Sequence, residues 1–186
     1  MFKKSFIVLP ILVLVSTFLL AFCKSDTDGE QIIEQQPLTV FCVRHAEKVK
    51  DVKDPDLTPA GKDRALELAN TLRNANIQYV HSSDYVRTRE TAAPTAAALG
   101  LTTEIYNPRD LESLIHKMKK QGGTHLVVGH SNTTPALVSL LGGDPHTEIN
   151  EASEYDRLYI VNASVDCEVS SLLMRYGETY VPEVND

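Results

Sequence analysis

Two arginines and two histidines have the chemistry needed to bind a phosphate group and transfer it. Arg44 is followed directly by His45, and Arg87 and His130 lie farther along the chain. A guanidinium group can donate two parallel hydrogen bonds to phosphate oxygens, and imidazole is the side chain best able to attack or to transfer protons near neutral pH. An arginine beside a histidine can also neutralise phosphate oxygens while the histidine attacks phosphorus. These four side chains therefore indicate a phosphate pocket, provided that the fold brings them together.

The four residues lie in polar segments that follow predicted strands. Short apolar runs rich in β-branched residues alternate with helical periods of three and four residues. The pattern predicts strands at residues 38–43, 77–81, 102–106 and 126–128, and a last, hairpin-like pair at residues 155–161 and 169–176. It predicts helices at residues 59–72, 86–99, 110–121 and 133–141, the first of them capped by Thr58 and beginning at Pro59.

Such alternation is typical of parallel strands joined by right-handed crossovers. We therefore expect an α/β protein, with a three-layer α/β/α sandwich and a mostly parallel central sheet. In such sheets, ligands bind beyond the carboxyl ends of the strands. Residues 44–45, 82–91 and 129–132 follow three of these strands, so side chains that are far apart in sequence can line one pocket.

The composition limits the class of protein. The 186 residues include 18 Lys and Arg against 25 Asp and Glu, which gives a formal net charge of −7. That charge repels a phosphate backbone and argues against a nucleic-acid partner. The hydrophobic share of 42% and the charged share of 23% are near the average for folded proteins, so we expect one ordinary folded domain. The oligomeric state stays open.

The amino-terminal segment has the pattern of an export signal. Residues 5–23 carry no charge and follow Lys3 and Lys4, which matches the basic and apolar regions of a secretory signal better than a buried helix. We predict a signal peptide at residues 1–22. The span is marginal in length for a permanent transmembrane helix.

Cys23 is the predicted lipidation site. Residues 20–23 resemble a bacterial lipobox, in which the cysteine becomes the lipidated first residue of the mature protein, although Phe22 departs from the small residue usual before it. An uncleaved signal anchor and soluble secretion are the alternatives. All three place the domain outside the cytoplasm, in the periplasm or cell envelope, and the first two attach it to the membrane.

The rest of the chain divides into a linker and a domain. Residues 23–37 are polar and lack periodicity, as expected of a tether, and residues 38–186 form the domain. Cys42 and Cys167 lie in apolar, strand-like contexts, and we expect free thiols rather than a disulfide. No Cys or His lies at ligand spacing from another, which argues against a metal site.

A set of motifs follows the predicted strands in a fixed order. They are Arg44-His45 with Glu47, Leu57-Thr58-Pro59 with Gly61, Ser83 and Arg87 with Thr91-Ala92, and Gly129-His130. This set resembles the histidine phosphatase superfamily, also called phosphoglycerate mutase-like proteins, over residues 38–161. Two positions depart from the family pattern: Ala46 replaces a glycine, and Asp84 replaces a proline, where an acid disfavours very anionic ligands.

The resemblance implies a role for each matching residue. His45 would be the nucleophile and form a phosphohistidine. Arg44, Arg87 and His130 would surround the phosphoryl group, with His130 also stabilising charge in the transition state. Ser83 and Asn132 are candidate substrate contacts, although Asn132 is equally placed to cap the helix that follows. No metal and no organic cofactor is implied.

The proton donor for the leaving group stays open. In the family an acidic residue often comes from the segment after the third strand, which here contains Asp110 and Glu112. Asp110 is also a potential helix cap, and Glu112 is a typical first-turn carboxylate. Glu47 is a further candidate, but it has the pattern of a loop residue that is solvated or pairs with an arginine. The remaining histidines and arginines near these motifs indicate structural or surface positions, namely His81, His116, His125, His146, Arg89 and Arg109.

Three functions are consistent with these residues. The first is a metal-independent phosphatase that hydrolyses phosphate monoesters or phosphorylated side chains of proteins. The second is a phosphomutase, which the short segments of this chain disfavour because family mutases carry insertions that enclose the substrate. The third is a lipoprotein that binds a phosphorylated ligand with little or no turnover, which the open question of the proton donor supports.

Overall fold

The computed structural model describes residues 37–166 and 168–182. The predicted signal peptide, Cys23, nearly all of the linker, and Cys167 lie outside the described residues, so these expectations stay predictions. Within the described part of the chain, no helix has the length and hydrophobicity that a membrane span requires.

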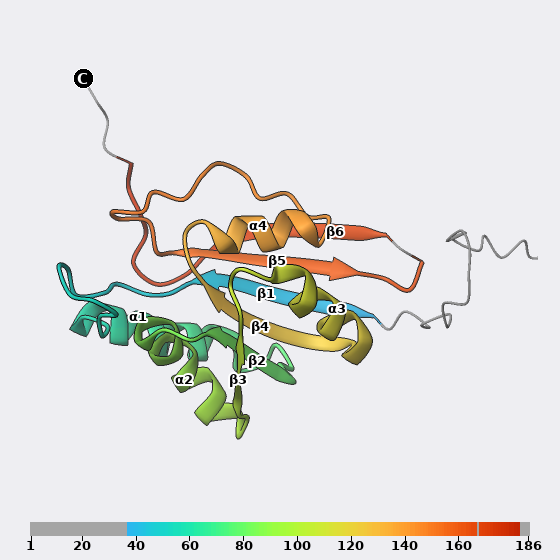
Figure 1. Cartoon of the computed structure of the whole chain (residues 1–186), viewed down its shortest axis with the longest axis horizontal. Coiled ribbons are helices and arrows are strands. Elements are labelled where there is room, and N and C mark those ends of the chain that lie inside the picture. The colour runs from blue at the N-terminus through green and yellow to red at the C-terminus, as the bar shows by residue number, and fades with distance from the viewer. Residues whose placement is uncertain (1–36, 167, 183–186) are drawn as a thin grey trace, which may run out of the picture. The chain divides into compact units, whose positions relative to one another are not determined.

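The described chain contains a six-stranded sheet and four helices (Figure 1). The strands are β1 (Leu38–Arg44), β2 (Tyr79–Ser83), β3 (Thr103–Tyr106), β4 (Gly123–Gly129), β5 (Arg157–Ala163) and β6 (Val169–Arg175). The helices are α1 (Pro59–Leu72), α2 (Val86–Leu99), α3 (Leu111–Gln121) and α4 (Thr133–Leu140). The order across the sheet is β3-β2-β4-β1-β5-β6.

Four neighbouring strands of the sheet are parallel, and the last two are not. β3, β2, β4 and β1 pair in parallel, whereas β5 is antiparallel to β1 and β6 is antiparallel to β5. The expected α/β fold with a mostly parallel sheet is thus confirmed. The bounds of three strands differ from the prediction by two residues or more: the second begins at Tyr79, the fourth at Gly123 and the fifth at Arg157. The fourth is longer because all seven of its residues pair with β1, while the apolar pattern marks only its buried middle.

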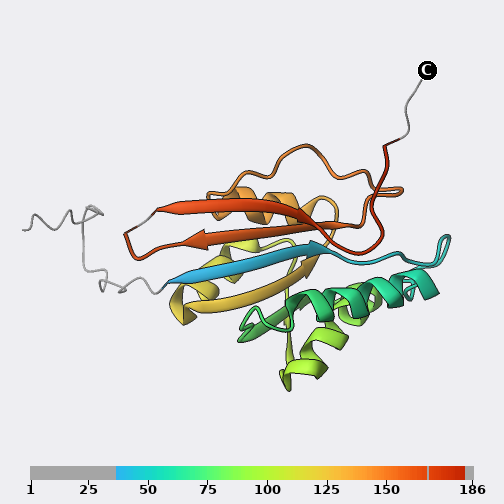
Figure 2. The same ribbon diagram turned by 180° about the vertical axis from the view of Figure 1, so that it is seen from behind.

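The helices cover both faces of the sheet, which makes the three predicted layers (Figures 1 and 2). Helices α3 and α4 pack on one face around a cluster that includes Val40, Met118 and Tyr159. Helices α1 and α2 pack on the other face around a cluster that includes Leu68 and Leu126. The sheet is therefore buried between two cores, and its strand ends are left for polar residues.

The loop between β1 and α1 folds back onto the start of α1. Thr58 caps the helix by accepting a hydrogen bond from the Gly61 backbone N–H at 3.1 Å, and Pro59 is its first residue. The Thr58 backbone N–H donates to the Glu47 carbonyl oxygen at 2.9 Å. A Cβ atom on Gly61 would lie 2.2 Å from that same oxygen. Only glycine therefore allows α1 to pack against the segment that follows His45.

We expect Gly61→Ala to lower the free energy of unfolding by about 1–3 kcal/mol, because the added methyl group displaces the Glu47 backbone. Urea denaturation of the purified protein measures this change. Lys62→Ala, at an exposed position in the same turn, is the control and should change the free energy by less than about 0.5 kcal/mol. Equal stability of Gly61→Ala and wild type would contradict this explanation of the glycine.

Candidate active site

Three parallel strands end at one edge of the sheet and carry the predicted site there. Arg44 is the last residue of β1 and pairs with Gly129, the last residue of β4. The next residues, His45 and His130, then lie side by side: their ring centroids are 5.6 Å apart, and the rings are inclined at 69°. The His45 backbone N–H donates to the Gly129 carbonyl at 2.9 Å. Residues 85 positions apart in sequence thus meet, as the parallel arrangement predicts.

His45 is buried and is held in one tautomer. Its Nδ1 atom lies 2.8 Å from the Ala46 carbonyl oxygen, and because a carbonyl only accepts hydrogen bonds, the proton of the neutral ring is on Nδ1. The lone pair is therefore on Nε2. Burial, and then the charges of Arg44, Arg87 and His130, lower the pKa of His45 to about 3. The ring is therefore neutral at pH 7, with an unprotonated Nε2.

His130 is fixed by a hydroxyl network from β2 and α2. The Thr88 hydroxyl donates to the Ser83 carbonyl oxygen at 2.8 Å, and the Ser83 hydroxyl donates to Thr88 Oγ1 at 3.1 Å. Ser83 Oγ then accepts from His130 Nε2–H at 2.9 Å. Burial, and then the charge of Arg87, lower the pKa of His130 to about 4. Ser83, a predicted substrate contact, is fully buried and instead positions His130.

Arg87 stands beside His130 on the first turn of α2. Its Nη2 atom lies 3.5 Å from His130 Nδ1, and its guanidinium carbon lies 4.5 Å from the centroid of the Tyr85 ring. The Asp54 carboxylate is 3.5 Å from Nη1. These contacts leave the Nε–H group of Arg87 buried without a hydrogen-bond partner.

Arg44 is buried by the segment that joins α4 to β5. Nη1 donates to the carbonyl oxygens of Asn150 and Glu154 at 3.0 and 2.9 Å, and Nη2 donates to the Glu151 carbonyl at 2.6 Å. The guanidinium group also lies over the Tyr155 ring, 4.1 Å from its centroid. The Nε–H group of Arg44 is buried and unpaired. Backbone carbonyls thus accept hydrogen bonds from both Nη atoms of Arg44, and Nε–H is the donor that remains without a partner.

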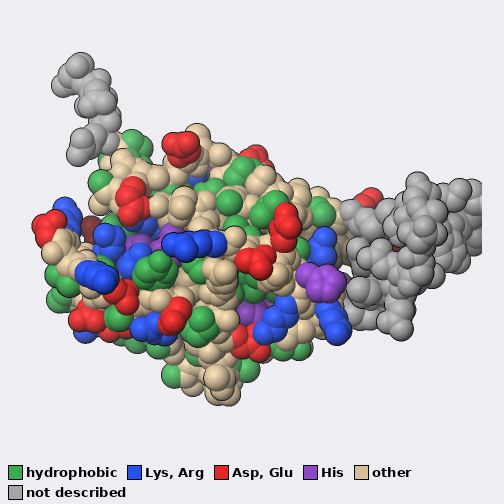
Figure 3. Space-filling model, in the orientation of Figure 1, with side chains coloured by type: hydrophobic (Ala, Val, Ile, Leu, Met, Phe, Trp, Pro, Cys, Tyr) green, Lys and Arg blue, Asp and Glu red, His purple; other side chains and the backbone are tan. Residues whose placement is uncertain are grey.

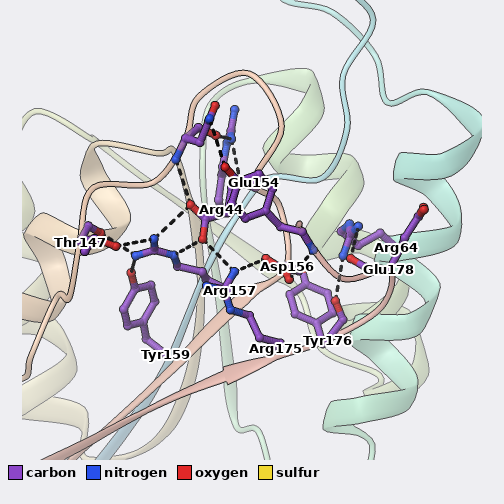
Figure 4. A network of polar contacts seen from close by, with 12 residues as sticks. Arg44, Arg64, Thr147, Glu154, Asp156, Arg157, Tyr159, Arg175, Tyr176 and Glu178 are labelled. Atoms are coloured by element: carbon purple, nitrogen blue, oxygen red, sulfur yellow. Dashed lines mark hydrogen bonds and ion pairs between the residues drawn. The ribbon is translucent and has the colours of Figure 1, made fainter. Parts of the chain in front are cut away.

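A buried ion-pair network anchors the segment that holds Arg44 (Figure 4). The Glu154 carboxylate, 3% exposed, accepts from Arg157 Nε at 2.6 Å and from Arg175 at 2.8 Å. Asp156 also pairs with Arg175, at 2.6 Å. Arg157 reaches back to the Thr147 carbonyl at 2.6 Å. Strands β5 and β6 therefore fix the loop, and the loop fixes Arg44.

A cavity of about 450 Å³ opens over the two histidines. Its walls include His45, Arg87, Arg109, His130, Asn132 and Glu151. In the space-filling view, histidine atoms are visible among Lys and Arg side chains at the left of the molecule, the end toward which β1 runs in Figure 1 (Figure 3). The surroundings suit an anion, although the whole chain is acidic.

Among the residues that line this cavity, Glu151 is the one carboxylate. Its Oε2 atom lies 3.0 Å from Arg44 Nη2 and accepts a hydrogen bond from the Ser131 hydroxyl. The side chain is 63% exposed. The sequence pattern does not distinguish Glu151, because one glutamate in a polar loop resembles any other.

The three predicted proton donors do not line the cavity. Asp110 caps α3 through hydrogen bonds from the Ser113 backbone and hydroxyl. These two bonds lower the pKa of Asp110. Glu112 is exposed in the first turn of that helix. Glu47 pairs with Arg64 through both carboxylate oxygens, at 2.9 and 3.1 Å from Nε.

Asn132 and Arg109 both line the cavity. The sequence left the role of Asn132 open, whereas it predicted a surface position for Arg109. The Asn132 side chain accepts from the Thr133 backbone N–H at 2.9 Å and thus caps α4, and it also lines the cavity. Arg109 lines the cavity from the short connection between β3 and α3. Arg89, by contrast, forms an exposed ion pair with Asp84.

Two histidines outside the cavity form a buried pair. His81 Nε2 and His125 Nδ1 are 2.9 Å apart, and His125 Nε2 lies 2.9 Å from the Gly122 carbonyl. Burial, and then the charge of His125, lower the pKa of His81 to about 4. Cys42 is buried and forms no disulfide among the described residues. Within the same described ranges, no group of three or more His, Cys, Asp or Glu side chains is placed to hold a metal ion.

Comparison with known proteins agrees with the geometry. The sequence model of the histidine phosphatase superfamily (branch 1) matches residues 40–112, a range that includes Arg44, His45, Ser83 and Arg87. The chain thus resembles this superfamily in its sequence over residues 40–112 and in its fold. His130 lies beyond the matched histidine phosphatase range, and the structure joins it to the site. A comparison with curated protein sequences gave no match.

Solved structures of histidine phosphatase and phosphoglycerate mutase type share the fold. One is the protein histidine phosphatase SixA complexed with tungstate, with a TM-score of 0.61 and 19% identity, covering 74% of this chain and 97% of SixA. Another is phosphoglycerate mutase from Bacillus anthracis, with a TM-score of 0.58 and 14% identity, covering 78% of this chain and 95% of the mutase. A third is the mycobacterial glucosyl-3-phosphoglycerate phosphatase, with a TM-score of 0.55 and 13% identity, covering 77% of this chain and 100% of that phosphatase.

The neutral state of His45 predicts a loss of stability in acid. The unfolded chain takes up a proton on this residue near pH 6.5, whereas the folded protein does so only near pH 3. Folding stability therefore falls as the pH drops from about 6.5 toward 3, and His45 alone should account for about 2 kcal/mol between pH 7 and pH 5. Urea denaturation at both pH values measures this change in the free energy of unfolding. His45→Gln should lose less stability over that interval, and an equal loss in both proteins would contradict the assignment.

Proposed function

We propose that this protein is a metal-independent phosphatase that forms a phosphohistidine intermediate on His45. The observation that carries the proposal is the state of His45. The ring is buried and neutral, its proton is held on Nδ1 by a carbonyl, and its Nε2 lone pair is free to attack. It stands next to a second neutral histidine and between two arginines.

The cations of the site support an anionic substrate. Arg44 and Arg87 each keep a buried Nε–H group without a partner, and a buried unpaired donor costs about 1–3 kcal/mol. Phosphoryl oxygens would satisfy both donors and, at the same time, balance the positive charge. His130, with its Nε2–H group committed to Ser83, would present Nδ1 and its ring edge beside Arg87.

The reaction would proceed in two displacements. His45 Nε2 attacks phosphorus, the bond to the leaving oxygen breaks, and this oxygen takes up a proton and departs as the alcohol. Water then attacks phosphorus and gives up a proton, the P–N bond breaks, its electron pair returns to Nε2, and inorganic phosphate leaves. The two arginines would stabilise the charge that accumulates on the phosphoryl oxygens in each step.

Hydrolysis is favoured over mutase chemistry because the site is open. The connection between β3 and α3 is only residues 107–110, and it cannot enclose a substrate. We infer that the substrate is a small phosphate monoester or a phosphorylated protein side chain. The structural neighbours that are named as a protein histidine phosphatase and a glucosyl-3-phosphoglycerate phosphatase support these two classes.

We expect the purified protein to hydrolyse p-nitrophenyl phosphate in the presence of a chelator. His45→Ala should lower this rate by at least about 10³-fold, because it removes the nucleophile. His116→Ala, which changes an exposed histidine on α3, should leave the rate unchanged. Activity that survives in His45→Ala would show that the nucleophile is wrong. A folded wild-type protein without turnover would instead indicate a protein that binds a phosphorylated ligand.

We propose, from the sequence pattern at residues 1–23, that the protein is an exported lipoprotein anchored through Cys23. In a bacterial host that processes lipoproteins, wild type should incorporate labelled fatty acid and sediment with membranes. Cys23→Ser should incorporate none, and Cys42→Ala is the control that should still be labelled. An unlabelled wild-type protein would favour an uncleaved anchor or soluble secretion.

A further inference from the structure

We propose that Glu151 is the proton donor to the leaving group, and the proton acceptor for the attacking water, of this site. The inference rests on the proposed phosphatase function and adds a residue to it. A phosphate ester of an alcohol needs a proton on its departing oxygen. Neither arginine can supply this proton, because a guanidinium group does not titrate near neutral pH.

The position of Glu151 is the first argument. Its carboxylate joins the two segments that carry the histidines: Oε2 contacts Arg44, the neighbour of His45, and Ser131, the neighbour of His130. The side chain lines the cavity and is 63% exposed. It therefore faces both the cavity over the two histidines and the solvent from which water would enter.

The second argument is that the other nearby carboxylates are bound by other groups and do not line this cavity. Glu47 is bound by Arg64 on both oxygens and lines a different cavity. Asp110 caps α3. Asp54 accepts from the Val86 backbone N–H at 3.0 Å and does not line the cavity over the histidines.

The chemistry balances over the two steps. In the first, the Glu151 carboxyl proton passes to the leaving oxygen as the P–O bond breaks and the bond from His45 Nε2 to phosphorus forms. Glu151 is then a carboxylate. In the second, this carboxylate takes a proton from water, the new O–P bond forms, and the P–N bond electrons return to Nε2. The departing oxygen and the attacking water occupy the same position opposite Nε2, so one residue serves both.

Substrate binding favours the protonated carboxyl group that the first step needs. Without substrate, Arg44 pairs with the Glu151 carboxylate. A phosphate dianion in the cavity competes for the same guanidinium group and repels the carboxylate, and two adjacent anions favour uptake of a proton. The alcohol leaves with that proton, and the pairing with Arg44 is restored for the second step.

Glu151→Gln tests the proposal, since it keeps the size of the side chain and the backbone carbonyl that binds Arg44. Rapid-quench kinetics with an alkyl phosphate should show phosphorylation of His45 slowed by about 10²–10⁴-fold. With p-nitrophenyl phosphate, whose leaving group needs no proton, phosphorylation should slow by less than about tenfold. Hydrolysis of the phosphohistidine should still be slow, so this variant should release a burst of about one nitrophenolate per protein molecule.

Glu148→Gln is the matched control, because Glu148 is exposed in the same connection and its carboxylate contacts neither Arg44 nor Ser131. It should behave as wild type with both substrates. Unchanged unfolding midpoints would show that both variants are folded.

The outcomes separate this inference from the function on which it rests. If Glu151→Gln slows phosphorylation equally with both substrates, or changes only KM, Glu151 merely positions Arg44 and the proposal is wrong while the phosphatase stands. If wild type turns over neither substrate, or His45→Ala retains activity, the proposed function fails and the role of Glu151 fails with it.

Discussion

The parallel pairing of β1 with β4 is the constraint on which the site depends. Its register places Arg44 opposite Gly129, and His45 and His130 follow as the next residue of each strand. Successive side chains of a strand point to opposite faces, so a slip by one residue would exchange the buried and the functional positions. The apolar residues of both strands, packed between two helical layers, oppose such a slip. The same burial that stabilises the sheet therefore fixes the distance between the histidines.

Burial at the strand ends also sets the chemistry. A histidine in water is partly charged near neutral pH, and a charged imidazole has no lone pair with which to attack. Burial and two neighbouring arginines keep His45 and His130 neutral. The cost is a set of polar groups that are incompletely paired, including the Nε–H groups of Arg44 and Arg87. In the proposed function, phosphoryl oxygens would supply acceptors for these two donors.

Two glutamates in the connection between α4 and β5 lie close together in sequence but have different surroundings. Glu154 is 3% exposed and neutralises Arg157 and Arg175, so it anchors the loop. Glu151 is 63% exposed and contacts Arg44. The backbone carbonyl groups of these same two glutamates accept hydrogen bonds from the Arg44 guanidinium group. The buried carboxylate thus ties the loop to β5 and β6, and the exposed one faces the cavity over the two histidines.

The sequence by itself determined the order of strands and helices and the two-sided burial of the sheet. It also determined that Arg44, His45 and His130 lie at strand ends and that Arg87 lies in the segment after a strand, because these features follow from local periodicity and from short motifs. It did not determine that Ser83 binds His130, that backbone carbonyls occupy Arg44, or that Glu151 is the carboxylate at the cavity while Asp110 and Glu112 lie elsewhere. Those facts depend on contacts between residues tens to more than a hundred positions apart. Every residue type has a backbone carbonyl, so a contact with a carbonyl cannot be predicted from residue type. The neighbours of a loop glutamate are decided only when β5 and β6 bring the loop to the ends of β1 and β4.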